Sequence, residues 1–245
     1  MTPLLVIEEI VKDYDGVRAL NGISLQVGKS AIKGLIGPNG AGKSTLFHLI
    51  SGVERPTSGR IYFLGVDITR KEPHEISAMG MGRTFQTIQI WGNMTAVENI
   101  MTGMHHRLRG GILSCGLWFP WIGREEREAL REAFDILEFL GLSAKWKWPA
   151  FQLSYGEQRL LEVGRALAMK PKIILLDEPA SGLTPAEVRT LADKIRRIKE
   201  QGTTIFVVEH HMGMVIEIAD EVAVLDHGEL IAAVSYTHLT LPTKA

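Results

Sequence analysis

A glycine-rich run in the first quarter of the chain is the strongest chemical signal in the sequence. It comprises nine consecutive residues: Gly37, Pro38, Asn39, Gly40, Ala41, Gly42, Lys43, Ser44 and Thr45. Their spacing matches a phosphate-binding loop, placed between an apolar run that ends at Ile36 and a helical pattern that begins at Thr45. Glycines let consecutive backbone N–H groups point inward, and a helix N-terminus adds partial positive charge. The run therefore predicts a polyphosphate site rather than a glycine-rich turn without a ligand.

Two side chains of this loop have chemistry of their own. We expect Lys43 to reach the β- and γ-phosphates of a nucleotide. We expect the Ser44 hydroxyl to complete a Mg²⁺ site whose ion bridges the same oxygens. The loop thus predicts ATP and Mg²⁺ as cofactors.

A pair of carboxylates provides the second signal. Asp177 and Glu178 directly follow the apolar run 173–176, at the end where a parallel sheet presents its ligand-binding edge. Asp177 suits the coordination shell of Mg²⁺, and Glu178 suits a residue that orients or deprotonates the attacking water. Acidic residues often follow a strand, so the pair alone is weak evidence. With a phosphate loop in the same chain, it is the expected partner.

The third signal is the sequence LSYGEQ, which begins at Leu153. Ser154 and Glu157 have the spacing of an N-cap and its capping-box partner at the start of a helix. A helix N-terminus with serine and glycine is also an anion site, here built on Ser154 and Gly156. Because the phosphate loop already holds one side of a nucleotide, we expect this second site to serve a nucleotide on another copy of the chain or on a homologue.

The elements that must position these residues alternate between short apolar strands and helical patterns. Six runs are predicted as strands, at 4–10, 31–36, 61–63, 173–176, 205–208 and 222–225. This alternation predicts an α/β fold with a mostly parallel sheet, whose centre holds the runs that lack polar alternation. Apolar residues keep helical spacing from Val188 to Ile198, and Gly202 follows as a helix stop.

Between residues 87 and 165 the strand signal disappears and helical periodicity replaces it. This change predicts a helical subdomain inserted into the α/β core. Its first part contains a loop rich in glycine and aromatic residues, 105–123. The loop is either a satellite hydrophobic cluster or a docking surface for a membrane partner, because exposed aromatic patches often mark interfaces.

The composition limits what else the chain can be. Its 245 residues suit one large α/β domain, and 27 basic against 28 acidic residues argue against nucleic acid as a partner. The single cysteine, Cys115, excludes an internal disulfide and a two-thiol metal motif. No signal-peptide pattern opens the chain, and the stretch 111–122 is shorter than the ~20 residues of a spanning helix. We therefore expect a cytoplasmic protein without direct membrane insertion.

The phosphate loop, LSYGEQ, the run IILLDEP and His210 follow one another in the order and approximate spacing found in ABC transporter ATPase subunits. The chain resembles this family from about residue 4 to residue 234, and LSYGEQ resembles the signature that separates it from other P-loop ATPases. The resemblance implies an α/β P-loop ABC ATPase core with a mostly parallel sheet, an antiparallel β portion near the N-terminus and an inserted helical subdomain. It also implies ATP hydrolysis by one half of a head-to-tail pair.

The same resemblance implies roles for further side chains. Tyr14 is expected to stack on adenine, Gln86 to contact Mg²⁺ and the attacking water, and His210, rather than the adjacent His211, to sense the γ-phosphate. In the alternative reading, Tyr14 is half-buried packing, Gln86 a surface residue and His210 a partner of a backbone carbonyl. The implied catalytic set is Lys43, Gln86, Glu178 and His210. The implied metal ligands are Ser44, Gln86 and Asp177.

Within the family, segments 83–86, 94–99 and 179–185 resemble the branched-chain amino acid uptake branch, although ATPases for urea uptake or lipopolysaccharide export have similar cores. The implied function is to energise an importer from the inner face of the cell membrane. The implied partners are integral membrane permease subunits and a second ABC ATPase subunit, identical or homologous. Two alternatives are a soluble ABC ATPase in cofactor assembly and a nucleotide-sensing module that binds ATP without hydrolysing it.

Two features depart from the family pattern. Thr184 stands where many ABC subunits have an aspartate in the loop that crosses the dimer interface, which weakens the case for coupling across it. The tail 235–245 has no helical apolar period and resembles cloning or adaptor sequence. We therefore expect a single ABC ATPase domain over residues 1–234, with the helical subdomain at about 87–165.

Overall fold

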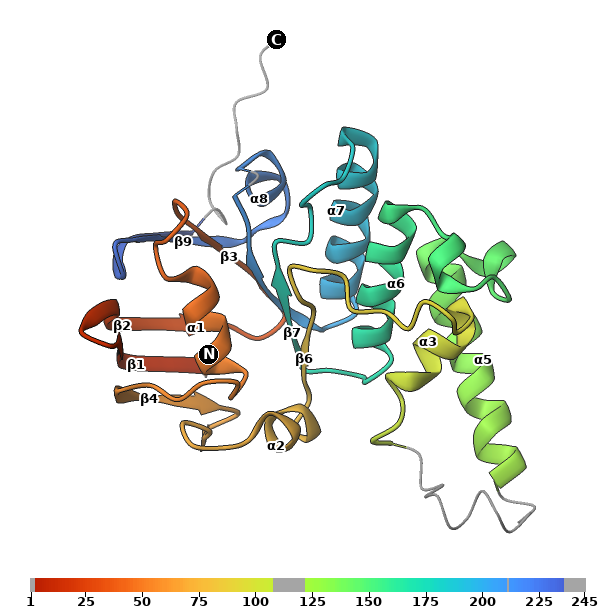
Figure 1. Ribbon diagram of the computed structural model, residues 1–245, viewed down its shortest axis with the longest axis horizontal. Helices are drawn as coiled ribbons and strands as arrows, with labels where there is room; N and C mark the ends of the chain where they lie inside the picture. The colour runs from red at the N-terminus through yellow and green to blue at the C-terminus, as the bar shows by residue number, and fades with distance from the viewer. Residues whose placement is uncertain (1–2, 108–121, 211, 236–245) are drawn as a thin grey trace.

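A computed structural model describes residues 3–107, 122–210 and 212–235. Cys115, His211, most of the loop 105–123 and the tail 236–245 lie outside the described residues, so the two interpretations of that loop stay open. The described chain has a part that contains two β-sheets and, beside it, a helical part (Figure 1).

A six-stranded sheet forms the centre of the molecule, in the order β10-β9-β3-β8-β7-β6. Its strands are β3 (Ile32–Ile36), β6 (Met81–Arg83), β7 (Ile173–Asp177), β8 (Thr204–Val208), β9 (Glu221–Asp226) and β10 (Glu229–Ser235). All neighbouring pairs are parallel except β9 and β10. Every residue of β3, β7 and β8 is buried, as expected for strands covered on both faces. The predicted mostly parallel sheet is confirmed.

A second sheet is antiparallel and lies near the N-terminus, in the order β2-β1-β4-β5. Its strands are β1 (Leu5–Tyr14), β2 (Val17–Val27), β4 (Ser58–Phe63) and β5 (Val66–Asp67). Helix α1 (Lys43–Ile50) joins the two sheets in one hydrophobic cluster. There, the ring centroid of Phe47 lies 5.1 Å from that of Phe206 on β8. The expected antiparallel portion is therefore present.

Helix α1 packs on one face of the six-stranded sheet, and further helices cover the opposite face. They are α6 (Tyr155–Leu167), α7 (Pro185–Glu200) and α8 (Met212–Ile218), while α2 (Pro73–Ala78) precedes β6. The buried positions of α7 are Val188, Leu191, Ala192, Ile195 and Ile198. These are the apolar positions that the sequence predicted at helical spacing. Gly202 follows with φ 94°, a conformation that glycine adopts readily after a helix.

The helical subdomain has its own hydrophobic cluster. It contains α3 (Ala96–Thr102), α5 (Ile122–Leu140), the short 3₁₀ turns Ser143–Lys145 and Ala150–Gln152, and the first half of α6. The described residues of the 87–165 window are helical or irregular, apart from one isolated bridge between Thr95 and Pro149. On α6, Leu161 belongs to this cluster and Val163 to the cluster beneath the sheet. Helix α6 therefore connects the subdomain to the core.

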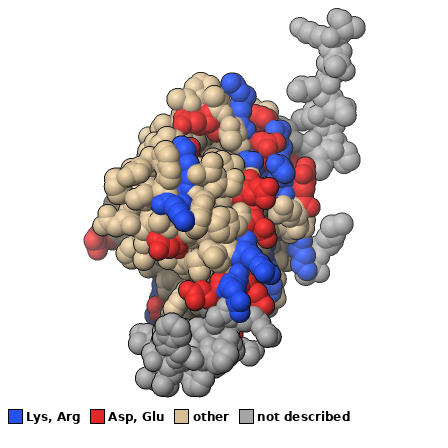
Figure 2. All heavy atoms as spheres, turned by 90° about the vertical axis from the view of Figure 1, so that its right-hand side faces the viewer, with Lys and Arg blue, Asp and Glu red and all other residues tan. Residues whose placement is uncertain are grey.

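None of the described helices is long and apolar enough to cross a membrane. On the described part of the face that carries the helical subdomain, basic and acidic side chains are interspersed (Figure 2). That face therefore lacks the large single-sign surface by which many proteins attract nucleic acid.

Candidate nucleotide-binding and hydrolysis site

The glycine-rich run forms the loop between β3 and α1 and borders a cavity of about 650 Å³. The residues around this cavity are Ala19, Gly37, Pro38, Asn39, Gly40, Gly42, Lys43, Ser44, Thr45, Gln86, Glu178 and His210. Ala41, the remaining residue of the run, is buried with 2% of its surface exposed. The fold thus brings most of the loop to one cavity, together with three side chains from distant parts of the sequence.

The last glycine of the loop has no room for a side chain, so its backbone lies close to the neighbouring strand. Gly42 precedes α1 with φ 99°, and a Cβ atom there would lie 2.7 Å from the carbonyl oxygen of Ala19. No side chain caps the N-terminus of α1. The first N–H groups of the helix and their partial positive charge are therefore available to an anion in the cavity.

Lys43 is held against the loop itself. Its Nζ donates to the carbonyl oxygens of Gly37 and Pro38, at 2.8 Å each, and only 5% of the residue is exposed. An ammonium group has three N–H donors, so these two bonds leave one for a phosphate oxygen. The structure places this cation at the phosphate cavity, where the sequence predicted it.

Glu178 is contacted by two of the other predicted catalytic side chains, Gln86 and His210. It follows β7 with φ 46°, and its backbone N–H donates to the Val208 carbonyl at 2.9 Å. Gln86 Nε2 donates to Glu178 Oε2 at 3.2 Å, and His210 Nδ1 lies 3.5 Å from the same oxygen. Three elements of the core thus converge on one carboxylate beside the phosphate loop.

Asp177 has one carboxylate oxygen without a partner among the described residues. It is 4% exposed, Oδ2 accepts a bond from Arg83 at 3.2 Å, and Oδ1 is buried and unpaired. A buried carboxylate oxygen is stabilised by a cation, and Mg²⁺ prefers oxygen ligands. Asp177, the Ser44 hydroxyl and the Gln86 amide oxygen supply such ligands. The residues present therefore fit a magnesium ion.

Glu209 is a site residue that the sequence analysis missed. It is fully buried, its Oε1 accepts the Ala180 N–H at 2.6 Å, and its Oε2 accepts the His210 N–H at 3.1 Å. These bonds hold the loop after Glu178 against the residue that carries the imidazole. The available signal was a carboxylate directly after the buried strand β8, the same pattern that identified the residues after β7.

Tyr14 lies outside the group of residues that borders this cavity. Its hydroxyl donates to the Glu54 carboxylate, and Lys12 Nζ lies 4.6 Å from its ring centroid. Burial, followed by the bond and the charge of Glu54, raises the pKa of Tyr14 to about 12, while the Thr45 side chain opposes this shift. The residue is 39% exposed, so its ring has a free surface. Stacking on adenine stays a prediction.

The LSYGEQ segment forms the predicted capped helix start. Ser154 is the N-cap of α6, its Oγ accepts the Glu157 N–H at 3.3 Å, and the Glu157 carboxylate accepts the Ser154 N–H at 3.0 Å. Ser154 and Gly156 border a separate cavity of about 180 Å³ and not the phosphate cavity. The structure of one chain therefore keeps the two predicted anion sites apart.

Thr184 caps α7 in the same way. Its Oγ1 accepts the Glu187 N–H at 3.4 Å, and the Glu187 carboxylate accepts both the backbone N–H and the hydroxyl of Thr184. Bonds from the Thr184 backbone and side chain, and then from the Gly156 backbone, lower the pKa of Glu187. A Cβ atom on Gly156 would collide with this carboxylate. Glu187 thus links the starts of α6 and α7.

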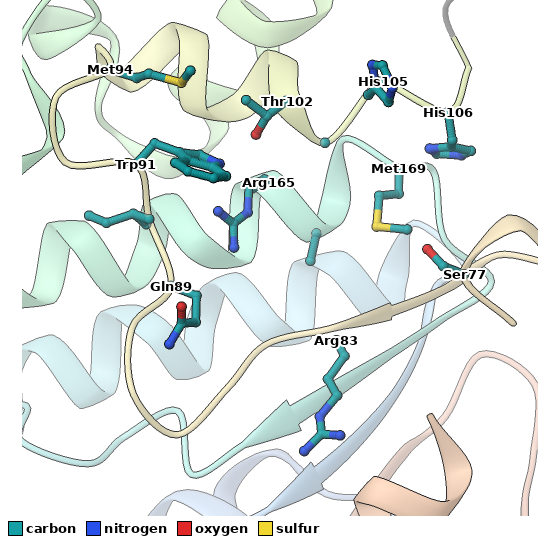
Figure 3. A pocket seen from close by; sticks show the side chains of 13 residues that line it. Ser77, Arg83, Gln89, Trp91, Met94, Thr102, His105, His106, Arg165 and Met169 are labelled. Atoms are coloured by element: carbon teal, nitrogen blue, oxygen red, sulfur yellow. The ribbon is translucent and has the colours of Figure 1, made fainter. Parts of the chain in front are cut away.

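A second cleft lies between the helical subdomain and the core. It has a volume of about 740 Å³ and is bordered by the loop after β6, the end of α3 and the end of α6. Trp91, which is 59% exposed, and Arg165 both border it, whereas the guanidinium of Arg83 points away (Figure 3). This cleft is open, mostly apolar and separate from the phosphate cavity.

A phosphate loop between β3 and α1, paired carboxylates after β7 and a helical insert containing a serine-capped LSYGEQ helix together define an ATPase of the ABC class. The chain belongs to the ABC transporter family, whose sequence model matches residues 20–181.

Curated relatives extend this similarity over almost the whole chain. The probable branched-chain amino acid transport ATP-binding protein LivG of Methanocaldococcus jannaschii is 39% identical over 229 residues, which cover 94% of this chain and 88% of the relative. The high-affinity branched-chain amino acid transport ATP-binding protein BraF of Pseudomonas aeruginosa is 36% identical over 231 residues, which cover 94% and 91%.

Solved structures show the same fold. The ADP conformation of an ATP-binding cassette of an ABC transporter superposes with a TM-score of 0.84 at 38% identity, over 96% of this chain and 92% of that chain. A dimeric ATP-binding cassette in a post-hydrolysis state, bound to ADP and Pi, shares the fold at a TM-score of 0.79 and 24% identity, over 94% and 98%.

Proposed function

We propose that this ABC ATPase energises an importer for branched-chain amino acids from the inner face of the cell membrane, as one of a pair of ATPase subunits. Hydrolysis is supported above all by one observation, the convergence of Gln86 and His210 on the Glu178 carboxylate beside the phosphate loop. The solute is proposed from the relatives, since LivG and BraF carry the name of branched-chain amino acid transport.

The phosphate loop binds the triphosphate through its backbone N–H groups and through the Lys43 ammonium. Ser44, Asp177 and Gln86 would hold a magnesium ion, which supplies positive charge to the phosphate oxygens as the terminal phosphoryl group is transferred. Because Gln86 Nε2 already donates to Glu178, its amide oxygen is the atom left for the ion.

Water attacks the γ-phosphate in line with the leaving oxygen. Glu178 accepts a hydrogen bond from this water and orients it, or takes its proton. His210, from the neighbouring loop, contacts the γ-phosphate and Glu178 together. Glu209 is a positioning residue, because it fixes the backbone on which the imidazole is carried.

The second half of the site comes from the other subunit. Ser154 and Gly156 of that subunit offer a helix N-terminus to the γ-phosphate of the first. These contacts exist only when the pair is closed, so ATP favours the closed state and hydrolysis removes the bridge. Their separation from the phosphate cavity within one chain supports this arrangement.

The open cleft beside Trp91 is proposed to receive the integral membrane subunits. Exposed apolar side chains at a concave surface are typical of protein interfaces. Motion of the helical subdomain, driven by closure of the pair, would then reach the membrane subunits through this contact.

Transport by the reconstituted complex tests the proposal. The chain is co-expressed with its membrane subunits, reconstituted into liposomes with a solute-binding protein, and supplied with radiolabelled leucine or urea and with ATP on the cytoplasmic side. ATP-dependent uptake of leucine, abolished by Glu178→Gln, is the expected result. Uptake of urea alone would replace the proposed solute, and ATP hydrolysis by a chain that binds no membrane subunit would favour a role in cofactor assembly.

A further inference from the structure

The wall of the cleft beside Trp91 carries a cation for which the described part of the chain offers no hydrogen-bonding partner. Arg165 borders the cleft from α6, and within the described residues its side chain makes no hydrogen bond or ion pair. Burial lowers the pKa of Arg165, and the only charge that opposes this shift is Glu162. A guanidinium with five N–H donors in a partly buried position is stabilised by an added acceptor.

Glu162 does not hydrogen-bond to Arg165 in the described structure, and most of its acceptor capacity is taken by other groups. It is 1% exposed, its Oε2 accepts from Arg159 at 2.8 Å, and its Oε1 accepts the N–H groups of Phe85 and Gln89 at 3.4 Å and 3.1 Å. Two guanidinium groups thus share one carboxylate. The described residues that border the cleft add His105 and His106 and include no aspartate or glutamate. The cleft therefore has a surplus of basic groups.

The apolar part of the cleft is held open rather than folded inward. The backbone N–H of Trp91 donates to Asn99 Oδ1 at 2.9 Å, and Asn99 Nδ2 donates to the backbone carbonyl of Trp91 at 3.0 Å. Asn99 is fully buried on α3, so these bonds fix the loop to the helix. Met94 at 40% and Trp91 at 59% exposure then present an apolar surface beside the cation.

We propose that Arg165 binds a carboxylate of the transmembrane partner, on a cytoplasmic segment that places an apolar side chain against Trp91 and Met94. An acidic segment complements this cleft because the described residues that border it are basic, polar or apolar and none is acidic. The proposal builds on the proposed function, since it names the chemistry that the membrane subunit must bring to this cleft.

The position of Arg165 also explains how binding of the membrane subunit affects the residues of the hydrolysis site. Arg159, beside the shared carboxylate, donates to the carbonyl oxygens of Phe85 and Gln86 at 2.8 Å each. When a partner carboxylate pairs with Arg165, Arg165 competes less with Arg159 for the negative charge of Glu162. Glu162 then binds Arg159 and the backbone of the loop 85–89 more strongly. That loop carries Gln86, whose amide touches Glu178. Docking is therefore expected to stimulate hydrolysis, with Arg165 as a positioning residue.

The test uses membrane vesicles that contain the co-expressed transmembrane subunits and vesicles of the same lipid without them. Arg165→Gln is expected to lower the affinity of the ATPase for the subunit-containing vesicles about tenfold, the effect of losing a hydrogen-bonded charge pair. Most of the ATPase stimulation by those vesicles is lost with it. Arg165→Lys keeps the charge and should retain most of the binding. Arg70→Gln, an exposed arginine near the antiparallel sheet, is the matched control.

Unfolding temperature and ATP retention of each variant show that the site remains folded. A charge reversal then identifies the partner residue: Arg165→Glu loses binding, and one aspartate or glutamate of the membrane subunit changed to lysine restores it. Wild-type-like binding and stimulation of Arg165→Gln would overturn this inference alone. Failure of the wild-type chain to bind vesicles that contain the membrane subunits would instead overturn the proposed function.

Discussion

At the scale of single residues, the two oxygens of the Glu178 carboxylate have different contacts. Oε2 is contacted by Gln86 and His210, whereas no hydrogen bond to Oε1 is found among the described residues. Only 12% of this side chain is exposed, and the exposed part faces the phosphate cavity. One oxygen is thus fixed by the protein, and the other is left to accept a hydrogen bond from water.

Glu178→Gln should therefore stop hydrolysis while ATP still binds. Loss of a general base lowers turnover by roughly 100-fold or more, and the intact phosphate loop keeps its affinity for ATP. Phosphate release measures the first effect, and size-exclusion chromatography with ATP shows whether a closed dimer accumulates. Glu200→Gln, at an exposed position on α7, is the control. Normal turnover in Glu178→Gln would remove this residue from its role.

Lys43→Ala should weaken ATP binding and turnover together. The ammonium contributes a charge-assisted bond to phosphate, worth about 1.5–3 kcal/mol, so affinity should fall at least tenfold. Equilibrium binding of a fluorescent ATP analogue measures this loss, with the exposed Lys29→Ala as the control. An unchanged affinity with lost turnover would show that Lys43 acts only in the chemical step.

The sequence predicted most of this site because its residues occur in contiguous motifs, whose spacing is set by one loop or one strand end. Glu209 was missed because its role depends on the Ala180 N–H, which only the fold brings to it. Arg159, Glu162 and Arg165 follow one another at three-residue spacing on α6, so their arrangement was visible in the sequence. Its significance was missed because only the fold shows that the carboxylate between the two arginines is buried.

At the scale of elements, the six predicted strands are all present because each is an apolar run that the core must bury. The other strands lack that signal. β6 has three residues, β10 is largely exposed, and β2 contains Gly22 at φ 69° and alternates apolar with polar residues. Their pairing depends on partners far away in the sequence, as for β2 with β1 and β10 with β9.

The cap of α7 provides a test at this scale. Thr184→Ala removes the side chain that accepts the Glu187 N–H, and loss of an N-cap typically costs about 1 kcal/mol of stability. Thr184→Asp restores an acceptor and should match the wild type. Urea denaturation measures the difference. Equal stability of the alanine and wild-type chains would show that this cap does not stabilise α7.

Acidification should remove the contribution of Glu187 to the free energy of unfolding. Hydrogen bonds in the folded state lower its pKa below the usual 4.5, so it stabilises the fold above that value and the contribution is lost as the pH falls through the lowered pKa. The wild type should be more stable than Glu187→Gln at pH 7, and the difference should shrink below about pH 4.5. Unfolding midpoints across this range measure it; a gap that widens on acidification contradicts the assignment.

At the scale of the whole molecule, α6 connects residues that belong to two different predicted nucleotide sites. Its N-terminus carries Ser154, which we expect to face the nucleotide of the partner subunit. About one turn further, Arg159 donates to the carbonyl oxygens of Phe85 and Gln86, and we expect Gln86 to contact the nucleotide of its own chain. A movement of the helical subdomain therefore shifts groups at both sites of a pair.

Mixing two inactive variants tests whether each site is shared between chains. Lys43→Ala removes the phosphate-loop half of a site, and Gly156→Asp removes the helix-tip half. A mixed dimer of these variants contains one site with both defects and one site with none, because the two halves come from different chains. Phosphate release should therefore be low for either variant alone and recover on mixing after subunit exchange, whereas two copies of one variant never form an intact site. If a chain hydrolysed ATP with its own loop and its own helix tip, mixing would restore nothing.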